Sequence, residues 1–231
     1  MPQTPLLLLP GLLEDADAFG HQVAGLRDIA ACTVADLTRS DSIAALAADA
    51  LAQAPARQFA LAGHSMGGYV ALEIMRRAPE RVARLALLNT HARADTPEST
   101  ANRRRLMALA ETDFPAVSAQ LLPNIVAPSH LKDIGISGTV TRMALAIGKD
   151  AFLRQERAII GRIDSRANLA AIRCPTLVVA ARGDAIMPLA ILEELAAGIP
   201  GARLAVIEGS GHMASIEQPA AVTRALREWL E

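Results

Sequence analysis

Short apolar runs recur along the chain and alternate with segments in which apolar residues have helical spacing. The first run, Leu6 to Leu9, ends at Pro10-Gly11, which is typical of a strand buried on both faces of a parallel sheet. Helical spacing is clear within residues 43–51 and 70–75. Alternation of this kind predicts an α/β fold, with a mostly parallel sheet and helices on both of its faces. We expect about six strands, at residues 6–9, 33–37, 59–62, 85–88, 176–181 and 204–207.

The alternation lapses once, between about residues 92 and 168. This stretch has only helix-like spacing, interrupted by several prolines and by the glycine segment 135–138. Because loops of that length are rarely structureless in compact domains, we expect helices there. We therefore predict a single domain over residues 1–231, in which a helical cap at approximately 92–168 is inserted between core segments 1–91 and 169–231.

Composition and charge narrow the classes of partner. Hydrophobic residues make up 52% of the chain and charged residues 20%, which is typical of a well-buried globular protein. With 23 basic and 24 acidic side chains and no long block of one sign, nucleic acid is not an expected partner. The chain has neither a signal-peptide pattern nor an apolar run of about 18 residues, so we expect a cytoplasmic protein without a membrane partner. Cys32 and Cys174 lack metal-ligand spacing and are expected to be free thiols.

A serine flanked by glycines follows the third predicted strand. The segment Gly63-His64-Ser65-Met66-Gly67 joins that strand to a helix that begins near Tyr69. A nucleophile on such a tight, strained bend needs small residues on both sides, because larger side chains would collide with the neighbouring strand or helix. We predict that Ser65 is a catalytic nucleophile.

A serine hydroxyl is a weak nucleophile near neutral pH and needs a base that a third group orients. His212 follows the last predicted strand in a glycine-rich loop, and Asp184 follows the strand before it. The carboxyl ends of parallel strands share one edge of the sheet, so Ser65, Asp184 and His212 are predicted to meet there. Asp95, which follows an earlier strand, is an alternative acid, and Asp184 could instead cap a helix.

These motifs resemble those of the α/β-hydrolase superfamily, in its small-esterase and lactonase branch, over nearly the whole chain. The matching pieces are residues 63–68, the acid loop 184–188 and the block 211–219. Two positions depart from the family pattern. Pro10 stands where a histidine often precedes Gly11, and Ala181 replaces the usual glycine three residues before the acid.

The resemblance implies an oxyanion hole built from the backbone N–H groups of Leu12 and Met66. Because such a hole uses backbone groups, the missing histidine side chain does not by itself remove it. The implied activity is that of a serine esterase for a small or medium, largely apolar acyl compound beneath the cap, with neither a metal nor an organic cofactor. A lactonase, an enol-lactonase or a thioesterase would use the same residues. A lyase or a ligand-binding protein on the same scaffold is a further alternative.

Several other polar residues have two interpretations. Gly11, His64 and His91 are candidates for the substrate pocket, although His64 is interpreted mainly as a packing and turn residue. The acidic run at 14–17 predicts a solvated first turn of a helix rather than a metal site. Three arginines at 103–105 predict the solvent-facing side of a cap helix, with a handle for an anionic substrate as the alternative.

Overall fold

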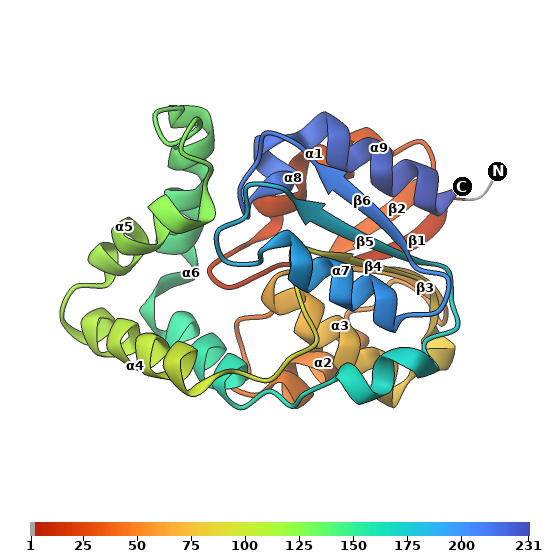
Figure 1. Ribbon diagram of the computed structural model, residues 1–231, viewed down its shortest axis with the longest axis horizontal. Coiled ribbons are helices and arrows are strands. Elements are labelled where there is room, and N and C mark those ends of the chain that lie inside the picture. The colour runs from red at the N-terminus through yellow and green to blue at the C-terminus, as the bar shows by residue number, and fades with distance from the viewer. Residues whose placement is uncertain (1–2) are drawn as a thin grey trace.

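A computed structural model describes residues 3–231 and has a parallel sheet at its centre (Figure 1). The sheet has six strands in the order β2-β1-β3-β4-β5-β6, and every neighbouring pair is parallel. The strands are β1 (Thr4–Leu9), β2 (Ala30–Val34), β3 (Phe59–His64), β4 (Val82–Leu88), β5 (Thr176–Ala181) and β6 (Arg203–Ile207). The predicted α/β fold with a mostly parallel sheet of about six strands is confirmed.

Helices cover both faces of the sheet, and the four leucines of β1 show why the apolar runs are continuous. Leu7 and Leu9 pack into the core on one face, whereas Leu6 and Leu8 pack into the core on the other. The first face is covered by α2 (Ile43–Ala52), α3 (Met66–Arg77) and α7 (Leu189–Gly198), and the second by α1 (Gly20–Leu26), α8 (Ala214–Glu217) and α9 (Pro219–Leu230). Successive side chains of a strand point to opposite faces, so a strand covered on both faces needs apolar residues at every position.

Strand β2 is the one strand whose position was predicted poorly. It spans Ala30–Val34 instead of 33–37, because the small residues at its start give a weak apolar signal on this edge strand. Past its end, the Asp36 carboxylate accepts the backbone N–H of Thr38 at 3.0 Å and turns the chain. Leu37 is buried by this turn and not by a strand.

The structure describes every residue between β4 and β5, and in this stretch the chain forms helices and no strand. The three longest are α4 (Pro97–Thr112), α5 (Phe114–Ile125) and α6 (Ile134–Ile160), and we call residues 97–160 the helical segment. Gly148 interrupts α6 with a φ of 80° and produces a kink. In Figure 1 the helical segment lies on the side to which the strand arrows point, so it stands over the carboxyl edge of the sheet. Within residues 3–231, the structure contains no helix with the length and apolar character needed to cross a membrane.

Candidate active site

Ser65 lies on a sharp bend between β3 and α3. Its φ of 50° falls in a region that non-glycine residues seldom occupy. A Cβ atom on Gly63 would lie 2.4 Å from the carbonyl oxygen of Gly67, and one on Gly67 would lie 2.1 Å from the carbonyl oxygen of Leu9. Both positions therefore require glycine, and the strained bend lifts the Ser65 side chain above the end of the strand.

A hydrogen-bonded series connects Ser65 to a histidine and an acid. The Oγ atom of Ser65 lies 2.9 Å from Nε2 of His212, and Nδ1 of His212 lies 2.7 Å from Oδ2 of Asp184. His212 and Asp184 are 4% and 5% exposed, so water competes little for these contacts. The two loops are joined by a hydrogen bond of 3.1 Å from the N–H of Gly183 to the carbonyl of Ser210. The structure thus brings together the three residues that were singled out in the sequence.

The Asp184 carboxylate accepts four hydrogen bonds. Oδ2 accepts from His212 and, at 2.8 Å, from Nδ2 of Asn89, while Oδ1 accepts the N–H groups of Ile186 and Met187, each at 2.9 Å. Burial raises the pKa of Asp184, but the charge of His212 and these hydrogen bonds outweigh burial and lower it overall. The ionised carboxylate holds a proton on Nδ1 of His212, which leaves Nε2 free to accept the Ser65 proton.

Asn89 was missed in the sequence. It follows β4 directly, is fully buried and has a φ of 46°. The sequence does contain a signal for Asn89, because it directly follows a strand. Ser65, Asp184 and His212 also follow strand ends.

The backbone N–H groups of Leu12 and Met66 donate no hydrogen bond within residues 3–231. Their neighbours, by contrast, are engaged. The N–H of Gly11 donates to the Glu14 carboxylate at 2.7 Å, and the N–H of Leu13 donates to the Gln155 side chain on α6 at 3.1 Å. These two anchors hold the loop on either side of Leu12 and leave its N–H available.

Glu14 and His64 form a buried pair beside the Ser65 bend. The acidic run was expected to be solvated, but Glu14 is 6% exposed, and its two carboxylate oxygens lie 2.8 and 2.9 Å from Nδ1 of His64. Nε2 of His64 lies 2.9 Å from the carbonyl oxygen of His212. Because both neighbours are acceptors, both ring nitrogens donate when His64 is charged. Burial lowers the pKa of His64, but the charge and hydrogen bond of Glu14 raise it overall. This pair links the loop at Gly11 to the loop of His212.

The raised pKa of His64 makes the stability of the fold depend on pH. A raised folded-state pKa stabilises the fold fully below the unfolded value of about 6.5, and the contribution is lost as pH rises through the folded-state pKa. We expect Glu14→Gln/His64→Gln, which removes both charges of the pair, to lower the free energy of unfolding most at mildly acidic pH, and by less as pH rises. Urea unfolding across this pH range measures the difference. His21→Gln, at an exposed histidine, is the control. A loss that stays constant or grows with pH would contradict the charged pair.

A cavity of about 390 Å³ opens beside Ser65 and His212. Most of its wall is apolar. The helical segment contributes both apolar and polar residues to it, and the polar ones come from α4, α5 and α6. The lining residues from the helical segment include Ser99, Asn102, Arg103, Leu106, Leu121, Ile125, Val140 and Met143.

Gly11, His64 and His91, which the sequence placed in the substrate pocket, are not among the residues described in this wall. Gly11 and His64 bond to Glu14, which does line the cavity. The ring of His91 lies behind Tyr69, with Nε2 3.3 Å from the tyrosine hydroxyl. Burial and the charge of Arg162 lower the pKa of His91 to about 4, so this ring is neutral near pH 7.

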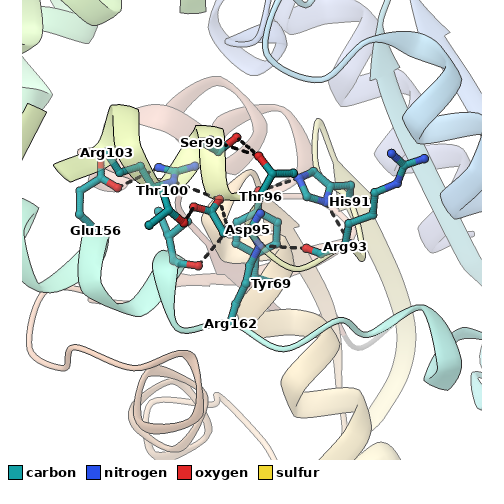
Figure 2. Close-up of polar contacts among 11 residues, drawn as sticks. Tyr69, His91, Arg93, Asp95, Thr96, Ser99, Thr100, Arg103, Glu156 and Arg162 are labelled. Atoms are coloured by element: carbon teal, nitrogen blue, oxygen red, sulfur yellow. Dashed lines mark hydrogen bonds and ion pairs between the residues drawn. The ribbon is translucent and has the colours of Figure 1, made fainter. Parts of the chain in front are cut away.

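Asp95, the alternative acid, lies in a separate polar network (Figure 2). Its carboxylate accepts from Nη1 of Arg162 at 2.8 Å and from the Thr100 hydroxyl at 2.7 Å. A longer contact of 3.3 Å joins it to Nε of Arg103, whose Nη1 donates to Glu156 at 2.8 Å. Asp95 therefore braces the start of the helical segment, and Asp184 is the acid bonded to His212.

The comparisons with known proteins agree with this architecture. The family model described as the alpha/beta hydrolase fold matches residues 4–219. The chain is 33% identical over 165 residues to a protein of Azorhizobium caulinodans that carries the name carbamate hydrolase RutD, a match that covers 69% of this chain and 61% of that relative. It is 34% identical over 169 residues to the pimeloyl-[acyl-carrier protein] methyl ester esterase of Aromatoleum aromaticum, over 68% of each chain.

A solved structure extends the likeness to nearly the whole chain. A thermophilic esterase from Thermogutta terrifontis superposes with a TM-score of 0.90 and 30% identity, covering 98% of this chain and 89% of that one. The matched region spans less than two thirds of the length of the first curated relative, at 61%. The family model, by contrast, runs from β1 to the start of α9 and includes every strand of the sheet. The chain belongs to the α/β-hydrolase fold family of hydrolases.

Proposed function

We propose that this hydrolase cleaves carboxylic esters of small or medium, largely apolar acyl compounds. The observation that supports this most directly is the series from Asp184 through His212 to Ser65, with contacts of 2.7 and 2.9 Å, at the wall of a mostly apolar cavity. A serine that a base activates, with the base oriented by an acid, is the arrangement that acyl transfer needs.

In the proposed cycle, Ser65 attacks the acyl carbonyl while Nε2 of His212 takes the proton from its hydroxyl. The negative charge that develops on the carbonyl oxygen is stabilised by the N–H groups of Leu12 and Met66, each of which contributes about 10²–10³ in rate in comparable sites. His212 then protonates the leaving alcohol, and water releases the acyl group by the same route. Asp184 stays ionised throughout and keeps His212 in its productive tautomer.

We further propose that the helical segment acts as a cap over the reacting groups. It contributes apolar and polar residues to the wall of the cavity, and burial of substrate beneath them would exclude water from the site. A volume of about 390 Å³ lies in the range of small-molecule sites, roughly 300–1,000 Å³. The size and lining favour an acyl group of modest length.

A substrate panel tests this function. Aryl and alkyl esters, lactones, thioesters and carbamates with matched acyl groups are incubated with wild type and with Ser65→Ala, and kcat/KM is measured for each compound. Among compounds with the same acyl group, we expect the highest values for the esters, and none above background for Ser65→Ala. If no compound distinguishes the two proteins, the hydrolase mechanism at Ser65 is wrong. Ester turnover that depends on Ser65 would also exclude a purely ligand-binding role.

A further inference from the structure

The cavity beside Ser65 has polar side chains on several elements, and α4 contributes its one arginine among the described residues. Ser99, Asn102, Arg103 and Leu106 of α4 have the spacing of one helix face, and all four line the cavity. Asn102 accepts a hydrogen bond of 3.0 Å from Arg105 through Oδ1, which leaves its amide N–H₂ as a donor. The groups that α4 presents to the cavity are therefore mainly hydrogen-bond donors.

Arg103 is the charged residue on this face, and its contacts within the protein leave some of its N–H donors without a hydrogen bond. Nη1 donates to Oε2 of Glu156 at 2.8 Å, and Nε makes the longer contact of 3.3 Å with Asp95 (Figure 2). Within residues 3–231, Nη2 makes no hydrogen bond, and Oε1 of Glu156 also lacks a partner. Arginine and carboxylate thus meet through one pair of atoms and not through the two-point contact that they favour.

Exposure and charge direct Arg103 toward the cavity. The Arg103 side chain is 20% exposed, whereas that of Glu156, which also lines the cavity, is fully buried. Asp95 also forms an ion pair with Arg162, with Nη1 of Arg162 2.8 Å from Oδ1 of Asp95. Burial raises the pKa of Glu156, although the charge of Arg103 opposes this rise. The raised pKa weakens the negative charge that Glu156 offers to Arg103. Arg103 therefore brings a guanidinium whose Nη2 has no hydrogen bond within residues 3–231 to the wall of the cavity.

We propose that Arg103 binds a carboxylate on the acyl part of the substrate, so that the preferred substrates are half-esters of dicarboxylic acids. The inference rests on the proposed esterase function. Asn102 and Ser99, on the same face of α4, supply additional donors to the carboxylate. Apolar residues of α5 and α6, among them Leu121, Ile125 and Met143, cover the methylene chain between the ester and this carboxylate.

Matched substrates test the carboxylate site. Monomethyl esters of dicarboxylic acids, from succinate to suberate, are compared with the dimethyl esters of the same acids. For each protein, the ratio of kcat/KM for the charged ester to that for the neutral ester is measured. Arg103→Gln should lower this ratio about tenfold or more, the loss expected for a hydrogen bond to a charged group. Glu156→Gln keeps Arg103 and removes the competing carboxylate, so it should raise the ratio about threefold or more.

The controls keep the test independent of folding and of the esterase function. Arg104→Gln changes an exposed neighbouring arginine that does not line the cavity, and its ratio should match that of wild type. Arg103→Gln/Glu156→Gln avoids leaving a buried carboxylate unpaired, and its ratio should also fall. A ratio unchanged in both Arg103 variants, or lowered by Glu156→Gln, would overturn the carboxylate site. If wild type does not hydrolyse even the dimethyl esters, the proposed function fails instead.

Discussion

Replacing Ser65 with alanine should lower kcat/KM for the best ester by about 10⁴–10⁶-fold. The bend places the Ser65 hydroxyl 2.9 Å from Nε2 of His212, so its removal eliminates the nucleophile while the cavity and the N–H donors remain. Those groups alone support only a small residual rate. Steady-state kinetics with purified proteins measures the loss, and thermal unfolding verifies that the variant is folded.

Ser118→Ala is the matched control for this experiment. Ser118 also lines the cavity but makes no hydrogen bond to a histidine within residues 3–231, so we expect its kcat/KM to stay within about tenfold of wild type. If Ser65→Ala loses no more activity than Ser118→Ala, Ser65 is not the nucleophile.

Replacing Asp184 with asparagine should reduce kcat by about 10⁴-fold with little change in fold, as removal of the orienting acid does in serine proteases. The new amide oxygen can still accept the N–H groups of Ile186 and Met187. The amide nitrogen would then face two donors, Nδ2 of Asn89 and Nδ1–H of His212. His212 would have to move its proton to Nε2, where it no longer accepts the proton of Ser65.

Asp95→Asn provides the comparison for Asp184→Asn. Asp95 bonds to Arg162 and Thr100 and not to His212, so its replacement should affect stability more than kcat. Both variants are measured by kcat per folded molecule and by urea unfolding. A larger loss of kcat in Asp95→Asn than in Asp184→Asn would reverse the assignment of the acid.

The fold could be predicted because its signals are local. A strand covered on both faces reads as a continuous apolar run, as at Leu6 to Leu9, and a parallel sheet collects its strand ends at one edge. The same rule led from Ser65, Asp184 and His212 to a common location. The apolar-run rule failed at β2, where small residues form the strand and the apolar Leu37 lies in the following turn.

The polar contacts around the site could not be predicted because they depend on tertiary packing. Glu14 lies in an acidic run that looks solvated in the sequence, yet it is buried against His64, 50 residues away. Arg103 lies in an arginine run that looks solvent-facing, yet it bonds to Glu156 on α6, 53 residues away. Composition alone does not distinguish a solvated charge from one whose partner arrives from a distant element.

The most direct test of the central claim is covalent labelling of the nucleophile. Wild type is treated with a fluorophosphonate, and peptide mass analysis identifies the labelled residue. We expect a single adduct on the peptide that contains Ser65, no adduct in Ser65→Ala, and much slower labelling in His212→Gln, because His212 activates the hydroxyl. An adduct on a different residue, or equal labelling of wild type and Ser65→Ala, would contradict the assignment of Ser65 as the nucleophile.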